Sequence, residues 1–442
     1  MNIRIILVIG VLVSFVLSCT SDFAISSLDV QLHEAIKRNS PTQDLDYFIM
    51  PQSDDYASLP NQDPHNPITK EKVDLGQLLF FETGLAQDAF RAVCLETYSC
   101  STCHIPSKGF LPGRMQGIAD GAFGFGDQGS HRSVVAGYDE TELDAQGNRP
   151  LTVMNVTYVT NTLWGGVFGA NDRNIGTEHA WTGLAEVNHT GFAGLEAQNI
   201  EGFHLHRLAI NDRVLYDFGY SELFDNAFPD VAEVERYTPE TASFAMGSFL
   251  RTILTNDAPF QDYLSGDETA ITESQKKGAV LFFGKAGCAT CHNSPSFSAM
   301  NFYTLGTRDM YESGGLNTSA DDPRIHGRGG FTGEENDMFK FKVPQLYNLK
   351  DYVTFFHGSS KMTIEEVIDF KLAAKSENPK VSDDQVALIP RSLTPEEKAN
   401  LIDFLTNALH DPNMNRYLPD SVLSGYCFPN NDAQSKSDIG CN

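Results

Sequence analysis

The chain has 442 residues, 41% of them hydrophobic and 11% aromatic, enough apolar side chains for packed cores in two or three domains. It carries 32 Lys and Arg against 58 Asp and Glu, a formal net charge of −26 at pH 7. This composition excludes a disordered chain. The negative charge argues against nucleic acid and anionic membrane surfaces as partners, and it favours solubility and basic partners.

The N-terminus has the pattern of an export signal. Arg4 precedes an almost wholly apolar run from Ile5 to Val16, which is too short for a comfortable membrane span. Val16-Leu17-Ser18-Cys19 is similar to a bacterial lipobox, in which Cys19 becomes the lipidated first residue; the alternative is an ordinary cleavage site with a stray cysteine. We therefore predict a signal peptide with a lipobox over residues 1–19. The mature protein is expected to be exported, periplasmic or held at the cell envelope only through a lipid on Cys19.

Residues 20–65 are polar and rich in turn-forming residues after one short amphipathic stretch formed by Leu28, Leu32 and Ile36. This pattern predicts a tether that leads to the first domain.

Two pentapeptides carry the main chemical signal. Cys100-Ser101-Thr102-Cys103-His104 and Cys288-Ala289-Thr290-Cys291-His292 share the pattern C-x-x-C-H. Two thiols at this spacing can each add to a haem vinyl group, and the histidine that follows can bind the iron. The alternative is a zinc site with four thiolates, which does not need a histidine after each pair. A similar apolar run precedes each pentapeptide, at 76–81 and at 278–283, as expected for a duplicated haem-binding unit.

The remaining elements are mostly helical. Lys70 to Phe81 and Ala242 to Ile253 are predicted helices, whereas residues 116–148, rich in Gly and Asp, predict a long and functional loop. Helix starts with an N-capping side chain are predicted at Thr272 (with Gln275), Thr363 (with Glu366) and Thr394-Pro395-Glu396-Glu397, the last with Leu401, Phe404 and Leu405 buried.

The order of motifs resembles that of the bacterial dihaem cytochrome c peroxidases and their MauG-like relatives. Over about residues 60–412 the chain shows L-G-x-x-L-F-F, C-x-x-C-H-x-P-x-x-G-F, P-x-T-x-x-N, a Trp, L-E-x-Q, a second C-x-x-C-H, F-K-V-P-x-L-x-N, F-H-G, T-x-E-E-V and L-T-x-E-E. The resemblance implies a mainly α fold with long loops and little β structure. It also implies two cytochrome c-like haem domains packed side by side, a peroxidatic one over 66–262 and an electron-transfer one over 263–412, followed by a tail over 413–442.

For the first haem, the resemblance implies a peroxide site above His104. Gln198 matches a family glutamine, and Trp164 matches the family indole between the haems, with plain core packing as its alternative. The family's acid–base glutamate is replaced, since the same offset falls on a leucine. We therefore predict that His206 moves the proton and that Arg207 stabilises developing negative charge. His131, in the long loop, is a further candidate for a displaceable ligand.

For the second haem, carried by His292, the family places a Met or Tyr as sixth iron ligand, and Lys371 occupies that position here. Ile364, Val367, Ile368 and Lys371 fall on one helical stripe, so the amine is expected to point where the apolar residues point. Ligation of iron by Lys371 and pairing with solvent or a propionate remain alternatives. Asn155 matches a family ligand for a calcium ion between the haems.

These patterns predict a peroxidase with two covalently bound haem c groups and possible calcium. It would reduce hydrogen peroxide with electrons from a small donor protein such as a monohaem cytochrome c or a cupredoxin, as a monomer or a homodimer. The alternatives are a MauG-like enzyme that oxidises Trp or Tyr of a partner protein, and a non-enzymatic electron carrier.

Four of the eight cysteines belong to the haem motifs and one is Cys19, which leaves Cys94, Cys427 and Cys441. An oxidising compartment permits a disulfide, and Cys427–Cys441 is predicted to staple the C-terminal tail.

Overall fold

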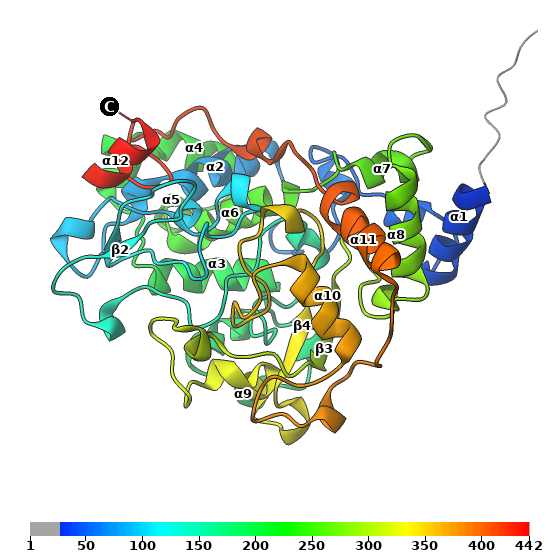
Figure 1. Ribbon diagram of the computed structural model, residues 1–442. Coiled ribbons are helices and arrows are strands. Elements are labelled where there is room, and N and C mark those ends of the chain that lie inside the picture. Colours follow the sequence, from blue (N-terminus) through cyan, green and yellow to red (C-terminus); the bar gives the residue numbers. More distant parts are fainter. Residues whose placement is uncertain (1–26, 442) are drawn as a thin grey trace, which may run out of the picture.

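Helices dominate the computed structural model, which describes residues 27–441 (Figure 1). The helices are α1 Ser27–Asn39, α2 Lys70–Phe81, α3 Gly194–Leu205, α4 Ser221–Ala227, α5 Glu233–Arg236, α6 Pro239–Thr252, α7 Pro259–Leu264, α8 Glu273–Phe283, α9 Arg328–Thr332, α10 Ile364–Ala373, α11 Pro395–Asp403 and α12 Ala433–Ile439. The described strands form two small antiparallel pairs, β1 Ala122–Phe123 with β2 Ser133–Val134 and β3 Ala299–Thr304 with β4 Lys340–Val343. The predicted mainly α fold with little β structure is confirmed.

The predicted helix starts are confirmed where a side chain caps the first turn. Thr272, Thr363 and Thr394 each accept a hydrogen bond from the backbone N–H three residues later, and α8, α10 and α11 begin directly after them. Helix α2 spans the predicted residues, and α6 covers the predicted buried segment from a cap at Thr238.

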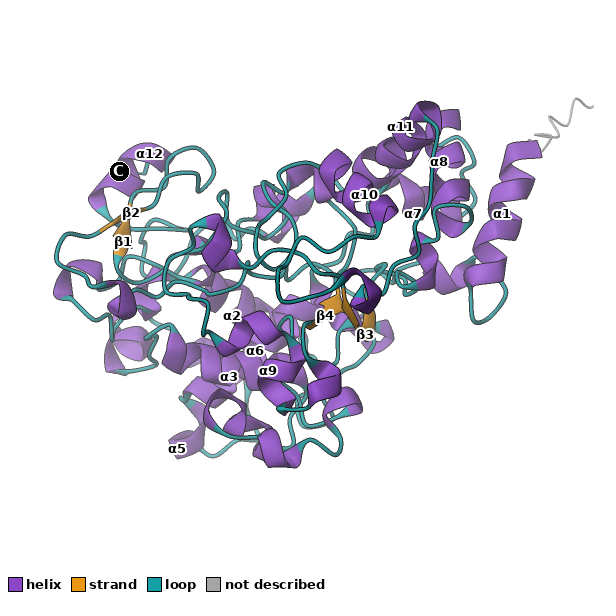
Figure 2. Ribbon diagram, turned by 60° about the horizontal axis from the view of Figure 1, so that its bottom comes forward, coloured by secondary structure: helices purple, strands orange, loops and turns teal. Residues whose placement is uncertain are grey.

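The same kind of close helix crossing occurs twice, between α2 and α6 and between α8 and α11. In α2, a Cβ on Gly76 would lie 2.0 Å from the carbonyl oxygen of Ala245 in α6, and in α8 a Cβ on Gly278 would lie 2.0 Å from that of Asn400 in α11. Only glycine permits such close backbone approach. Both glycines begin the apolar runs that precede the C-x-x-C-H motifs. The α8–α11 pair lies at the upper right of Figure 2, apart from the α2–α6 pair. The duplication read in the sequence is therefore also present in the packing.

The segment predicted to be a tether differs from that expectation. Its described part, residues 27–65, contributes Leu32, Ile36, Phe48 and Met50 to the apolar core formed around α7, α8 and α11. Helix α1 packs on α8, at the right of Figure 1. The polar and turn-rich composition concealed isolated large apolar residues, whose burial removes apolar surface from water and fixes the segment. The predicted signal peptide and lipobox, including Cys19, lie outside the described residues.

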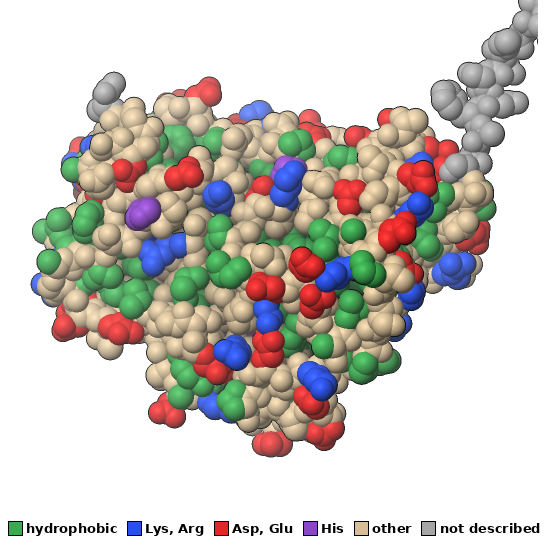
Figure 3. Space-filling model, in the orientation of Figure 1, with side chains coloured by type: hydrophobic (Ala, Val, Ile, Leu, Met, Phe, Trp, Pro, Cys, Tyr) green, Lys and Arg blue, Asp and Glu red, His purple; other side chains and the backbone are tan. Residues whose placement is uncertain are grey.

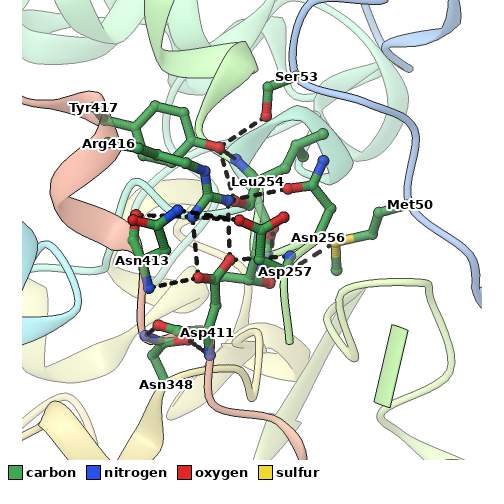
Figure 4. Close-up of polar contacts among 12 residues, drawn as sticks. Met50, Ser53, Leu254, Asn256, Asp257, Asn348, Asp411, Asn413, Arg416 and Tyr417 are labelled. Carbon is green, nitrogen blue, oxygen red and sulfur yellow. Dashed lines mark hydrogen bonds and ion pairs between the residues drawn. The ribbon is translucent and has the colours of Figure 1, made fainter. Parts of the chain in front are cut away.

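A polar cluster joins distant parts of the chain (Figure 4). Arg416 donates to the buried carboxylate of Asp411 at 2.9 Å and to the carbonyl oxygen of Leu254 at 2.7 Å, while Asn348 donates to the Asp411 carbonyl at 2.8 Å. The Tyr417 hydroxyl donates to the same Leu254 carbonyl at 2.8 Å. These bonds hold the start of the tail against the segment that links the two halves.

The tail returns to the N-terminal half. The predicted disulfide Cys427–Cys441 is present, and Asp438 of α12 accepts hydrogen bonds from the N–H groups of Phe125 and Gly126 at 2.8 and 2.7 Å. The tail thereby pins the long loop over residues 116–148.

The surface carries mixed charge. On the face in Figure 3 acidic and basic side chains are interspersed, and Lys398 pairs with Glu365 at 2.8 Å between α11 and α10. Over residues 27–441, no helix is long and apolar enough to cross a membrane.

Candidate functional site

Both pentapeptides face one large cavity of about 700 Å³. Its wall includes Cys100, Cys103 and His104 of the first motif and Cys288, Cys291 and His292 of the second. Each motif begins with a single 3₁₀ turn, Cys100–Thr102 and Cys288–Thr290. The second turn follows α8 closely, whereas residues 82–99 separate the first turn from α2. The repeated local structure thus brings two sets of thiol and imidazole groups to a shared space.

The two motif histidines are oriented in the same way. His104 Nδ1 lies 2.9 Å from the carbonyl oxygen of Phe110, and His292 Nδ1 lies 2.7 Å from that of Phe297. A carbonyl can only accept, so Nδ1 carries the proton and Nε2 keeps a lone pair for a metal. Phe110 and Phe297 both adopt positive φ, 53° and 55°, a conformation that non-glycine residues rarely take. Burial lowers the pKa of each histidine to about 4, so both imidazoles are neutral.

The donor set and the charges of the cavity fit two haem groups. The four thiols of the two C-x-x-C motifs form no disulfide. Arg149 reaches the cavity wall with a buried Nη1 that has no hydrogen-bond partner among residues 27–441, although its Nε donates to the Phe356 carbonyl at 2.9 Å. An unsatisfied buried guanidinium nitrogen is costly, and a carboxylate such as a haem propionate would satisfy it.

The N-terminal end of the cavity is lined by one face of α3. Gln198 and Gly202 of α3 contribute to the wall, and so does His206, which follows the last residue of the helix. His206 Nδ1 lies 2.7 Å from Oδ2 of Asp144, which comes from the long loop. Partial burial lowers the pKa of His206, but the Asp144 carboxylate more than offsets this, so the pKa is raised above its ordinary value.

Arg207 borders the cavity and is bonded to the long loop. Its Nη1 pairs with the buried carboxylate of Asp120 at 2.5 Å, and its Nη2 donates to the Glu142 carbonyl at 3.0 Å. The positive charge is therefore already compensated, although the residue borders the cavity. Sequence spacing placed Arg207 beside His206, but the backbone turns there, with φ of 53° at Arg207, and directs the guanidinium to the loop.

Trp164 lines the cavity that the two motifs share. Its side chain is 7% exposed, and its indole N–H donates to the carbonyl oxygen of Arg149 at 2.7 Å. It packs edge-on against Phe341 and His357, with ring centroids 6.4 and 6.3 Å away. Trp164 is therefore packed in the protein core and also lines the cavity that both motifs share.

Lys371 faces the C-terminal end of the cavity. Ile364, Val367, Ile368 and Lys371 all line it, so the predicted stripe of α10 points inward together with the amine. Its Nζ lies 5.5 Å from the centroid of the Phe356 ring, and no carboxylate pairs with it among the described residues. Burial lowers the pKa of Lys371 to about 8.

The remaining candidates lie elsewhere. Asn155 is buried and uses its side chain within the protein, with Nδ2 donating to Thr255 at 2.9 Å and Oδ1 accepting from the Thr255 N–H at 3.0 Å. No cluster of three or more His, Cys, Asp or Glu side chains suited to a metal occurs in residues 27–441. His131 is exposed in its loop and does not contribute to the cavity wall.

Sequence reasoning missed three participants. Asp144 lies in the loop that was predicted to be functional, but nothing in the sequence singled it out from its acidic neighbours. Arg149 directly precedes the P-x-T-x-x-N motif, and nothing in the sequence marks it as a residue of the cavity wall. His357, in F-H-G, forms a buried pair with Asp309 at 2.8 Å and borders the cavity.

A mainly helical chain with two C-x-x-C-H turns on one cavity has the features of a dihaem c-type protein. A profile of the family described as di-haem cytochrome c peroxidase matches residues 70–269. The methylamine utilization protein MauG of Methylorubrum extorquens is 27% identical over 364 residues, which cover 80% of this chain and 83% of the relative. Cytochrome-c peroxidase IdrP1 of Pseudomonas sp. (strain SCT) is 25% identical over 365 residues, covering 77% and 81%.

Among solved structures, a MauG-like protein associated with microbial copper homeostasis superimposes with a TM-score of 0.55 at 25% identity, covering 83% of this chain and 95% of that one. These matches confirm the predicted resemblance to the dihaem cytochrome c peroxidases and their MauG-like relatives. The family that the profile describes consists of dihaem enzymes of the peroxidase type.

Proposed function

We propose that this protein is an exported dihaem c-type peroxidase that reduces hydrogen peroxide to water with electrons from a small donor protein. The observation that carries the proposal is that both C-x-x-C-H motifs line one cavity, each with its histidine Nδ1 held by a nearby backbone carbonyl. The four motif thiols would attach two haem groups covalently, one in a domain over residues 66–262 and one in a domain over 263–412. When bound, the haems supply iron that exchanges electrons with peroxide and with the donor.

In this proposal, different residues of the cavity wall bind peroxide, transfer its proton and carry the electron. Above the His104 end, Gln198 orients peroxide and His206 moves a proton from its near oxygen to its far oxygen. Trp164, beside the cavity centre, relays the electron between the two ends. The donor, such as a monohaem cytochrome c or a cupredoxin, delivers electrons at the His292 end. Lipid attachment at Cys19 and homodimer formation belong to the same proposal.

A second function is favoured by one observation, the amine of Lys371 in the cavity wall, at the position where the family resemblance implies a Met or Tyr. An amine ligand lowers the potential of iron relative to a thioether, which makes the second haem a poorer acceptor from ordinary donors. This favours a MauG-like oxidation of Trp or Tyr on a partner protein. A Lys371→Ala protein is expected to show a changed absorption spectrum of the second haem; an unchanged spectrum would exclude ligation by Lys371.

The test is stopped-flow spectroscopy of the haem-loaded protein, fully oxidised and then half-reduced, mixed with peroxide and a reduced small cytochrome c. Rapid catalytic oxidation of the cytochrome is expected, and its dependence on half-reduction would show that the first haem must be activated. A long-lived oxidised state without turnover would support the MauG-like function. Low-spin spectra of both haems in every redox state, with no turnover, would support an electron carrier.

A further inference from the structure

His206 and Asp144 form a hydrogen-bonded pair in the wall of the cavity. The 2.7 Å bond joins His206 Nδ1 to Asp144 Oδ2, and the Asp144 side chain is only 6% exposed whereas the His206 side chain is 35% exposed. No residue over 27–441 bonds to His206 Nε2, and the residue lines the cavity. The imidazole therefore has one nitrogen held by the protein and one open to a reactant.

Backbone bonds fix both members of the pair. At the end of α3, the His206 N–H donates to the Gly202 carbonyl at 2.9 Å, and the His206 carbonyl accepts from the Tyr98 hydroxyl at 2.9 Å. In the loop, the Asp144 N–H donates to the Asp120 carbonyl at 3.1 Å, and the Asp144 carbonyl accepts from the Ala119 N–H at 2.9 Å. The end of α3 thus holds the imidazole and the long loop holds the carboxylate, and together they fix the distance between the two groups.

The other charges near His206 do not replace Asp144. Arg207 follows it in the chain and opposes its protonation, but Arg207 is itself paired with Asp120. His104, at the same end of the cavity, is neutral because burial lowers its pKa to about 4. Tyr98 bonds to the backbone of His206 and not to its ring. Among the described residues, Asp144 is the anionic side chain that hydrogen-bonds to the imidazole of His206.

We propose that Asp144 is the positioning residue for His206, holding Nδ1 protonated so that Nε2 faces peroxide as a base and stabilising the imidazolium that forms when it takes the proton. This inference rests on the proposed peroxidase function. A carboxylate behind a histidine selects the tautomer and compensates the developing charge, and an amide in its place can stabilise the wrong tautomer. The His206–Asp144 pair then replaces the single glutamate expected at this position in the family.

The experiment compares Asp144→Asn, Asp144→Glu and the native protein, all haem-loaded, by peroxide turnover from pH 5 to pH 9. Asp144→Asn is expected to lower kcat at least about tenfold, within the contribution of general acid–base catalysis, and to move the acidic limb of the profile to lower pH, because the anion that favours His206 protonation is lost. Asp144→Glu is expected to restore the profile. Asp139→Asn, in the same loop and without contact to His206, is the matched control.

A second measurement does not depend on turnover. Cyanide must lose its proton to bind oxidised haem, so the rate of the absorption change on adding cyanide reports on the base in the cavity. Asp144→Asn is expected to slow this reaction and shift its pH dependence, and His206→Gln with Asp144→Asn should be no slower than His206→Gln alone. Native turnover and cyanide kinetics in Asp144→Asn would overturn the inference while leaving the peroxidase proposal intact. If the native protein lacks turnover but cyanide kinetics respond to Asp144→Asn, the pair stands and the peroxidase proposal fails.

Discussion

Replacing Gly76 by Ala is expected to destabilise the protein, although alanine is the better helix former. The added Cβ would lie 2.0 Å from the carbonyl oxygen of Ala245 and 2.4 Å from its carbon, where Cβ contacts below 3.0 Å are essentially never found, so α2 and α6 must separate by about 1 Å. Overpacking against backbone costs up to about 3 kcal/mol. The gain in helix propensity is about 1 kcal/mol, which leaves a net loss near ~2 kcal/mol.

The assay is guanidinium unfolding of the haem-loaded protein followed by circular dichroism. Gly278→Ala should behave in the same way, because its Cβ meets the Asn400 carbonyl oxygen at 2.0 Å. Gly202→Ala in α3 is the matched control, since its Cβ would meet only the His206 ring, at 3.8 Å, and the substitution should raise stability by up to about 1 kcal/mol. A Gly76→Ala protein as stable as the native protein would show that the two helices do not cross this closely.

Three further predictions concern other contacts. Replacing both Cys427 and Cys441 by Ser should destabilise the tail by roughly 3 kcal/mol, because a loop closed across 14 residues is released, and limited proteolysis of the tail would measure this. Glu196→Gln should lower the free energy of unfolding by about 3–5 kcal/mol, since it leaves the buried Arg251 without its charged partner, and denaturant unfolding would measure the loss. The pKa of His206 is raised in the folded protein, so its stabilisation is present at low pH and lost as pH rises through that folded pKa; unfolding of native and His206→Gln proteins from pH 5 to pH 9 would show it.

Each of these has a clear contrary result. Unchanged proteolysis of the tail in the double serine variant would show that Asp438 and the other polar contacts hold it without the disulfide. If the free energies of unfolding of the Glu196→Gln and native proteins differ by less than about 1 kcal/mol, the buried pair with Arg251 is contradicted, because breaking such a pair costs at least about 3 kcal/mol. Parallel stability profiles of native and His206→Gln proteins would show that His206 titrates alike in the folded and unfolded states.

Local features were predictable because their causes are local. Helices α8, α10 and α11 begin where a threonine hydroxyl meets an N–H three residues away, and no distant part of the chain is needed to form that bond. The C-x-x-C-H pattern is likewise complete within five residues. The prediction of a tether over residues 20–65 is wrong for its described part, residues 27–65. The composition there is polar, but a few apolar side chains pack into the core around α7, α8 and α11.

By itself, the sequence determined the two haem motifs, the duplicated apolar helices before them, the helix caps and the resemblance to a family. Only the tertiary structure decided which groups meet in the cavity. Asp144 and His206 are 62 residues apart, and Arg207 is turned away to Asp120, 87 residues away. Such pairings depend on how a long loop is held by backbone bonds and by the distant tail. The physical reason is that hydrogen bonds and ion pairs require contact within about 3 Å, which chain spacing alone does not specify.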